Sequence, residues 1–125
     1  MIRTHQLFKS VRHALRGAGV VFREEQNFRI QVAMGVLVLL LAAFFGVRIY
    51  EWILLILLIG AVWTLELVNS IIERLADAFK PRLHSYVKDV KDIMAAAVLI
   101  ASLIAGAVGI TIFYPYLAAL VSRLS

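Results

Sequence analysis

Three long apolar runs without a single charged side chain constrain this chain more than any other feature. They cover Ile30–Val47 with 18 residues, Trp52–Leu65 with 14 and Ile93–Tyr114 with 22. An α-helix needs about 20 predominantly apolar residues to cross the hydrocarbon core of a bilayer. The first and third runs meet this requirement, and the second does so if its helix continues into the polar residues after Leu65. The sequence therefore predicts an all-α integral membrane protein with three transmembrane helices.

Composition agrees with a single membrane domain. The 125 residues are 62% hydrophobic with a mean hydropathy of +0.90, well above an ordinary soluble domain. The first apolar run lacks a small-residue cleavage pattern, so we expect it to be retained rather than removed as a signal peptide. The chain has no cysteine, which excludes disulfides and thiol chemistry. We predict an interfacial helix at 1–27, transmembrane helices at 28–49, 51–78 and 91–118, and a cytoplasmic link at 79–90.

The basic residues are divided unevenly between the two ends of the predicted helices. Of 13 Lys and Arg, six precede the first run and five lie between the second and third, whereas the first link and the tail carry one each. Because cytoplasmic segments carry the excess of Lys and Arg, we expect the N-terminus and the link 79–90 in the cytoplasm and the C-terminus outside. Aromatic side chains, which favour membrane interfaces, cluster at the predicted outer end: Tyr50, Trp52, Tyr114 and Tyr116. The net charge of +5 thus indicates topology and anionic lipid, and we expect no nucleic-acid partner.

The segment before residue 28 has the pattern of an amphipathic helix. Its apolar residues recur mostly at spacings of three and four, and they are Leu7, Phe8, Val11, Leu15, Ala18 and Phe22. Basic side chains occupy the other side. Such a helix lies in the plane of the headgroups with its apolar face against the acyl chains. It serves either as a membrane anchor or as a flap over a site at the cytoplasmic face, and the pattern leaves both open.

Polar residues follow one face of the second predicted helix where its apolar run ends. This acidic stripe consists of Glu66, Asn69, Glu73 and Asp77. At 100° per residue they fall within an arc of about 80°, over a rise of roughly 16 Å. Ionisable groups inside a membrane are costly, which makes them candidates for function. Carboxylates bind hard cations such as Mg²⁺ and share them with phosphates, so the stripe indicates a cation and phosphate site.

A second polar set begins the third predicted helix. Pro81 is expected to end the second helix, because proline cannot continue one. His84 follows, and Lys88, Lys91 and Asp92 share one helical face by their spacing. A lysine neutralises phosphate oxygens, and a carboxylate near the headgroups can deprotonate a lipid hydroxyl. With a metal ion, these are the parts that phosphoryl transfer needs. The chain has no glycine-rich phosphate loop, so a nucleotide site would be built from helix surfaces.

Taken together, these residues resemble the bacterial membrane-integral diacylglycerol kinase family, which also contains the undecaprenol kinases. The resemblance rests on the motif E-x-x-N-x-x-x-E-x-x-x-D at 66–77, on His84 with the pair Lys91-Asp92, and on Glu25-Gln26-Asn27-Phe28-Arg29 with the upstream Lys9-Ser10, Ala14 and Gly17. It covers roughly residues 5–115. The combination at this spacing is specific, whereas each element alone is weak.

The resemblance implies a homotrimer of three-helix subunits, each with an amphipathic surface helix, in the bacterial inner membrane. It implies transfer of the γ-phosphoryl group of MgATP to a lipid alcohol at the cytoplasmic interface. Glu66 stands at the position of the general base with Asn69 beside it in the catalytic set, and Glu25 and Glu73 match the Mg²⁺ ligands that also contact ATP. The other nucleotide positions are His13, Asp77, His84, Lys91 and Asp92, and the lipid positions are Glu66, Ser70 and Ala96. The family commonly has tyrosine where this chain has His13, and imidazole can stack or donate a hydrogen bond there.

The resemblance offers two acceptors. We expect diacylglycerol, which would give phosphatidic acid, with undecaprenol as the alternative. The stretch Glu25–Gln31 is more similar to Gram-positive members, many of which prefer undecaprenol. A non-enzymatic alternative is a small cation-permeation subunit whose path the acidic stripe would line. Against it, the carboxylates occupy one half of the membrane, and the other two apolar runs carry no polar stripe. A purely structural assembly protein leaves the stripe unexplained.

Overall fold

The structure is a computed structural model that describes residues 1–79, 82 and 84–125. Within this part of the chain it contains four helices and no strand. They are α1 (Thr4–Glu24), α2 (Gln26–Phe45), α3 (Ile49–Ala78) and α4 (His84–Leu124). The last three are long and apolar enough to cross a membrane. The all-helical membrane architecture predicted from the apolar runs is confirmed.

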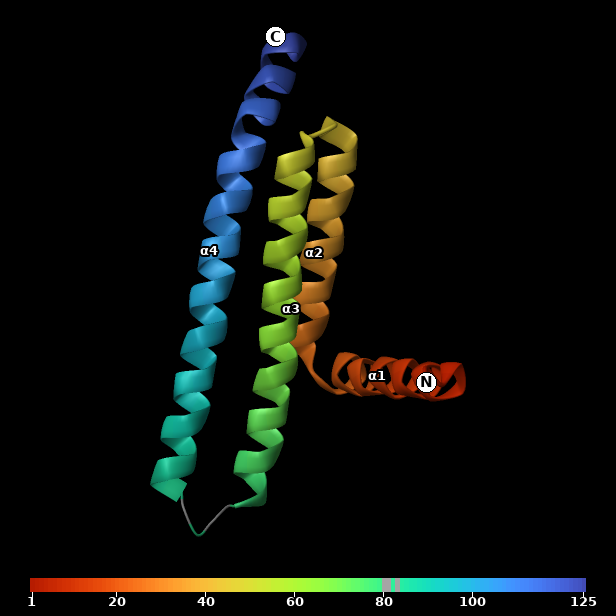
Figure 1. Ribbon diagram of the computed structural model, residues 1–125. Coiled ribbons are helices and arrows are strands. Elements are labelled where there is room, and N and C mark those ends of the chain that lie inside the picture. The colour runs from red at the N-terminus through yellow and green to blue at the C-terminus, as the bar shows by residue number, and fades with distance from the viewer. Residues whose placement is uncertain (80–81, 83) are drawn as a thin grey trace.

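The three long helices run side by side and form the body of the molecule, with α3 packed against both α2 and α4 (Figure 1). The helix α1 projects sideways from the lower end of this bundle. Glu25 separates α1 from α2, because its extended backbone, with φ −117° and ψ 116°, interrupts the helical conformation. A single residue thus changes the direction of the chain, and it is one of the predicted metal ligands.

Tight packing concentrates at the end of the bundle where α2 turns into α3. The buried residues there are Ala42, Val47, Leu55 and Ile112. The rings of Phe45 and Phe113 pack against them, 6.1 Å apart between centroids. Elsewhere the long helices leave large apolar side chains exposed, for example Leu40, Leu57 and Leu103, each more than 60% exposed. Such surface is suited to contact with lipid chains or with another membrane helix.

Local interactions fix the turn between α2 and α3. Gly46 ends α2 in the left-handed conformation with φ 62°, which glycine adopts without steric cost. The backbone N–H of Arg48 then donates to Glu51 Oε1 at 3.0 Å in a capping box at the start of α3. The hydroxyl of Tyr116 also donates to Glu51 Oε1, which ties α4 to the same turn. This end of the bundle is therefore stapled, and the acidic stripe lies at the opposite end.

The predicted boundaries agree at the end of α3 and differ in α4. The helix α3 ends at Ala78, whereas Pro81, expected to terminate it, lies outside the described residues. The helix α4 begins at His84 rather than at residue 91, so much of the predicted link 79–90 is helical. It also continues through Pro115 to Leu124, beyond the predicted end at residue 118. An internal proline removes one backbone hydrogen bond, and this loss does not stop the helix here.

Candidate active site

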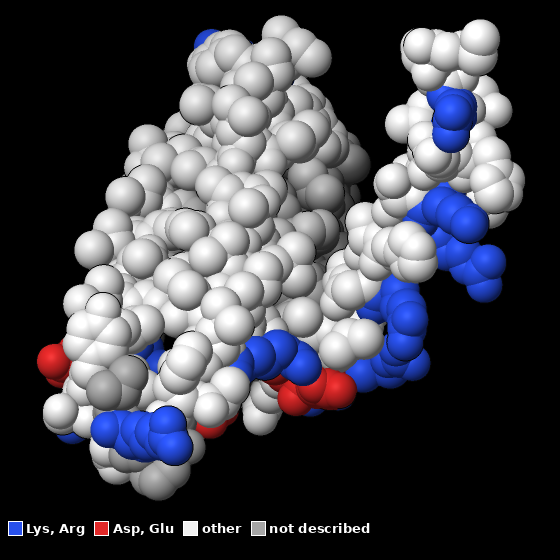
Figure 2. Space-filling view, turned by 60° about the horizontal axis from the view of Figure 1, so that its bottom comes forward, with Lys and Arg blue, Asp and Glu red and all other residues white. Residues whose placement is uncertain are grey.

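The charged side chains gather at the end of the molecule from which α1 projects. Figure 2 shows Lys and Arg along α1 and at the lower end of the bundle, with Asp and Glu among them, while the visible body of the bundle is almost entirely uncharged. The acidic stripe occupies this end of α3. The stripe thus lies where a membrane-buried surface meets a charged one.

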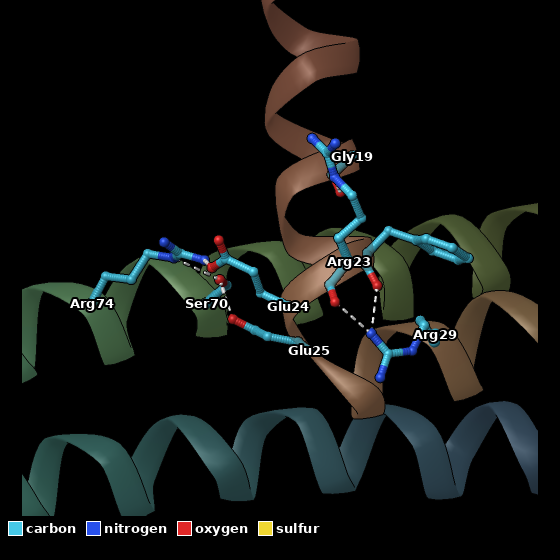
Figure 3. A network of polar contacts seen from close by, with 8 residues as sticks. Gly19, Arg23, Glu24, Glu25, Arg29, Ser70 and Arg74 are labelled. Atoms are coloured by element: carbon cyan, nitrogen blue, oxygen red, sulfur yellow. Dashed lines mark hydrogen bonds and ion pairs between the residues drawn. The ribbon is translucent and has the colours of Figure 1, made fainter.

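A set of side-chain bonds joins the turn between α1 and α2 to α3 (Figure 3). The hydroxyl of Ser70 donates to Glu25 Oε1 at 2.5 Å, and Arg74 Nε donates to the same hydroxyl at 3.3 Å. Arg74 also pairs with Glu24, with 2.6 Å between Nη2 and Oε2. Ser70 is only 1% exposed, whereas the side chains of the Arg74–Glu24 pair are at least half exposed. The buried hydroxyl is therefore the contact that holds Glu25 against α3.

Arg29 fixes the turn from the other side. Its Nη1 atom donates to the backbone carbonyls of Phe22 at 2.9 Å and Arg23 at 2.8 Å (Figure 3). These carbonyls belong to the last turn of α1, where the helix itself supplies no partners. A cation at the negative end of the helix dipole is also favourable. Arg29 thus closes α1 and helps to aim the following residues, including Glu25, at α3.

Glu66 lies at the centre of the carboxylates. The residue is 4% exposed, and Glu25 and Glu73 are near enough to act on it electrostatically. The side-chain amide of Gln31 is a hydrogen-bonding neighbour of the same carboxylate. One turn further along α3, Asn69 Oδ1 is buried without a hydrogen-bond partner among the described residues. The structure therefore brings Glu25, Glu66, Asn69 and Glu73 together, as predicted.

This donor set suits Mg²⁺ only when the ion is shared with phosphate. Among the described residues no group of three or more His, Cys, Asp or Glu side chains is arranged to hold a metal ion alone. Mg²⁺ is usually bound through one or two carboxylates, with phosphate oxygens and water completing its coordination. Glu25 and Glu73 supply two carboxylates, and the orphaned amide oxygen of Asn69 is a further hard donor. The residues present therefore fit a nucleotide-bound Mg²⁺ ion.

The outer end of the acidic stripe meets the start of α4. Lys91 Nζ donates to Asp77 Oδ1 at 2.8 Å, and the lysine side chain is 28% exposed. This contact holds the ammonium group within the acidic end of α3, where a phosphate could compete for it as an anion. His84 and Asp92 lie exposed on the same helix, in its first turns. The structure thus places Asp77 and Lys91 together, two turns beyond Glu66.

Three predicted positions lie apart from this centre or have a different environment. His13 is exposed on the portion of α1 that projects away from the bundle, so a single subunit does not bring it to the carboxylates. Ala96 is exposed on α4, one turn beyond Asp92. Ser70 was predicted to contact lipid, but it is buried and its hydroxyl is engaged by Glu25 and Arg74. Its observed role is to hold a carboxylate in place.

An apolar groove of about 740 Å³ runs along the three long helices from the level of this centre. Gln31 and Ser102 line one end of it, Tyr114 and Leu117 line the other, and almost all of the remaining lining is aliphatic. Val62, one turn before Glu66 on the same helix, also contributes to the wall. The groove therefore ends next to the most buried carboxylate of the site.

Sequence reasoning did not identify Arg74, Arg29 or Gln31 as parts of this arrangement. Arg74 was considered only as a partner of the stripe, and Arg29 as a residue at the membrane surface. Their signals were present, since Arg74 follows Ser70 by four residues and Arg29 stands four residues after the helix break at Glu25. Gln31 had a signal too, as an amide inside an otherwise apolar run. Its partners on α3 and α4 are distant in sequence, so only the structure shows them.

Comparison with known proteins bears directly on this site. The family described as prokaryotic diacylglycerol kinase matches residues 12–113. An undecaprenol kinase of Bacillus subtilis is 36% identical over 113 residues, which cover 90% of this chain and 92% of that protein. A diacylglycerol kinase of Haemophilus influenzae is 34% identical over 105 residues, covering 84% and 88%. A diacylglycerol kinase of Helicobacter pylori is 34% identical over 95 residues, covering 76% and 74%.

The match includes all of the carboxylates of the site and all three long apolar helices. It also extends over most of the length of the chain and of the relatives, so it concerns the whole fold rather than one motif. The chain therefore belongs to the prokaryotic diacylglycerol kinase family and is a lipid kinase, an enzyme that transfers phosphate to an alcohol.

Proposed function

We propose that this enzyme transfers the γ-phosphoryl group of MgATP to the hydroxyl of a long-chain lipid alcohol at the cytoplasmic surface of the bacterial inner membrane. The observation that carries the proposal is the place of Glu66, a 4% exposed carboxylate between an apolar groove and a charged end. A buried carboxylate is costly unless it has a task. At this position it can meet a hydroxyl group that arrives from the membrane.

The lipid side of the site is the groove along α2, α3 and α4. Its lining is almost entirely aliphatic, so an acyl or isoprenoid chain is a suitable occupant. The end that carries Gln31 and Ser102 would receive the polar head of the lipid. A lipid in this position has its hydroxyl beside Glu66 and its chain parallel to the helices, as in the surrounding bilayer.

The nucleotide side is the charged end of the stripe. Glu25 and Glu73, with Asn69, are suited to a Mg²⁺ ion bound between the β- and γ-phosphates, and the ion supplies charge neutralisation when bound. Lys91 is placed to neutralise phosphate oxygens. Asp77, His84 and Asp92 remain proposed nucleotide contacts. We also propose that His13 belongs to this site through another subunit, because α1 projects away from its own bundle.

The reaction follows from this order of groups. Glu66 accepts the proton of the lipid hydroxyl as its oxygen attacks the γ-phosphorus atom. The new bond joins the lipid oxygen to phosphorus, and the bond from phosphorus to the β–γ bridging oxygen breaks, so ADP leaves with the bonding pair. Lys91 stabilises charge on the phosphate oxygens. The protein mainly positions the two substrates and excludes water, as in other phosphoryl transfers.

Of the two acceptors, we favour undecaprenol over the diacylglycerol predicted from the sequence. The relative named undecaprenol kinase is 36% identical over 90% of this chain, and the stretch Glu25–Gln31 resembles members of that type. Diacylglycerol remains the second candidate, since relatives named diacylglycerol kinase are 33–34% identical. Both lipids present a primary hydroxyl at the headgroup level. Membership in a family of lipid kinases leaves the cation-permeation alternative without support.

We propose in addition that the enzyme works as a homotrimer with α1 lying in the cytoplasmic interface. The exposed apolar surface of the long helices needs lipid or a second copy to cover it. On α1, apolar side chains such as Leu7 and Leu15 are more than half exposed, which suits insertion at the headgroup boundary. The basic residues beside them suit anionic lipid and put the N-terminus in the cytoplasm.

The test is a direct comparison of acceptors. The purified protein in mixed micelles receives MgATP labelled in the γ-phosphate, with undecaprenol, with diacylglycerol, or with an undecaprenyl methyl ether that lacks the hydroxyl. We expect labelled lipid with undecaprenol, less with diacylglycerol and none with the ether. Preferential labelling of diacylglycerol would reverse the order of the acceptors. ATP hydrolysis without any labelled lipid would contradict the proposed function.

A further inference from the structure

We infer that Gln31 is a positioning residue for this reaction, and that it holds the Glu66 carboxylate at the end of the apolar groove while Trp63 and Ser102 hold Gln31. The inference rests on the proposed function and adds to it a residue outside the acidic stripe. It also names the two partners through which that residue is fixed. All four side chains come from helices that meet at this level of the bundle.

The contacts of Gln31 join all three long helices. Its side-chain Nε2 donates to Ser102 Oγ on α4 at 3.1 Å. Its backbone carbonyl accepts a hydrogen bond of 3.0 Å from Trp63 Nε1 on α3. The same side-chain amide neighbours the carboxylate of Glu66. An amide nitrogen has two N–H groups, so it can bind Ser102 with one and Glu66 with the other.

The packing around Gly35 makes the Trp63 contact possible. A Cβ atom at Gly35 would lie 2.7 Å from Cζ2 of Trp63 and 2.9 Å from Cγ2 of Ile59. Glycine is therefore needed for the indole ring to lie against α2 and to reach the Gln31 carbonyl one turn away. Trp63 precedes Glu66 by one turn of α3. Fixing the indole against α2 thus sets the rotation of α3 at the level of the catalytic carboxylate.

An amide is well suited to this position. Glu25 and Glu73 both act on Glu66 as like charges, so the carboxylate needs a partner that orients it. The amide of Gln31 supplies a donor and adds no charge, and a donor already bound to Ser102 has little freedom to rotate. Since Gln31 and Ser102 also line the groove, an arriving lipid hydroxyl meets an oriented base.

The experiment compares kcat with the KM for MgATP in the purified full-length enzyme, with the better of the two lipids as acceptor. Gln31→Leu removes the amide at similar volume, and Ser102→Ala removes its anchor. Ser102→Thr keeps the hydroxyl, and the groove beside Ser102 has room for its methyl group. Val36→Leu is the matched control on the exposed side of α2.

We expect Gln31→Leu to lower kcat by about 10- to 100-fold with little change in the KM for MgATP, because misplacing a reacting group acts on the chemical step. Ser102→Ala should lower kcat by several-fold, and Ser102→Thr should restore it. The double variant Gln31→Leu with Ser102→Ala should be no worse than Gln31→Leu alone, since both changes break one chain of contacts. Val36→Leu should match the unmodified enzyme.

Each outcome decides the matter. An unmodified enzyme that labels neither lipid would remove the proposed function and this inference with it. An active enzyme whose kcat survives Gln31→Leu would overturn the inference alone. Equal kcat in Ser102→Ala and Ser102→Thr would do the same. If Gln31→Leu fails to fold, Trp63→Phe keeps a ring and loses the N–H, and unchanged kcat in that variant would also overturn the inference.

Discussion

Replacing Ser70 with alanine tests how the predicted metal ligand Glu25 is held. In the structure the Ser70 hydroxyl donates to Glu25 at 2.5 Å and accepts from Arg74 at 3.3 Å, and the residue is 1% exposed. Alanine removes both bonds and one oxygen atom without adding bulk. The carboxylate of Glu25 then has no donor on α3 and can leave the position that it shares with Glu73.

The size of the effect follows from the stronger of the two bonds. A hydrogen bond to a charged group contributes about 1.5–3 kcal/mol, and 1.4 kcal/mol corresponds to a factor of ten. If the whole contribution serves to orient Glu25, the apparent affinity for Mg²⁺ should fall by about 10- to 150-fold. This range agrees with the loss of roughly 10- to 100-fold that follows removal of groups that orient metal ligands.

The assay is the dependence of phosphorylated lipid on Mg²⁺ concentration at fixed ATP. Ser122→Ala is the matched control, because that hydroxyl donates to the Ala119 carbonyl of its own helix, is exposed and lies far from the stripe. We expect the half-saturating Mg²⁺ concentration to rise in Ser70→Ala and to stay constant in Ser122→Ala. An unchanged Mg²⁺ dependence in Ser70→Ala would refute the role assigned to this hydroxyl.

Three further substitutions test other parts of the site. Glu66→Gln should abolish lipid phosphorylation and leave MgATP binding intact, measured by calorimetry, and retained turnover would remove Glu66 from the role of base. Glu73→Gln should raise the Mg²⁺ concentration needed for half-maximal activity by at least tenfold, and an unchanged requirement would count against its assignment as a ligand. Gly35→Ala should lower the stability by about 1–3 kcal/mol, because its Cβ would overlap Trp63. Thermal unfolding in detergent measures this loss, and an unchanged midpoint would show that the indole ring moves freely.

The helices and the acidic stripe were predictable because both depend on local spacing. A run of about 20 apolar residues predicts a membrane helix wherever it stands. The period of 3.6 residues likewise places Glu66, Glu73 and Asp77 on one face of α3 whatever surrounds it. The start of α4 was less predictable, because the polar residues between His84 and Lys91 carry no apolar signal that separates helix from loop.

The contacts across the bundle were not predictable from spacing. Glu25 and Ser70 are 45 residues apart, and Gln31 and Ser102 are 71 residues apart. Their meeting depends on how α2, α3 and α4 pack, and that depends on details such as the absence of a side chain at Gly35. The resemblance to a family supplied Glu25 as a ligand, but it gave no reason for the position of its side chain. The structure supplies that reason in Ser70, Arg74 and Arg29.

The two proposed metal ligands are held in different ways, and this difference decides which substitutions should matter. Glu73 belongs to the interior of α3, so the backbone of that helix sets its position. Glu25 stands at the break between α1 and α2, outside either helix, and side-chain bonds at that break hold it. The exposed pair of Arg74 and Glu24 is the weaker of these, since solvent screens exposed ion pairs. The buried Ser70 hydroxyl is therefore the group through which α3 controls the second ligand, although it reaches no phosphate itself.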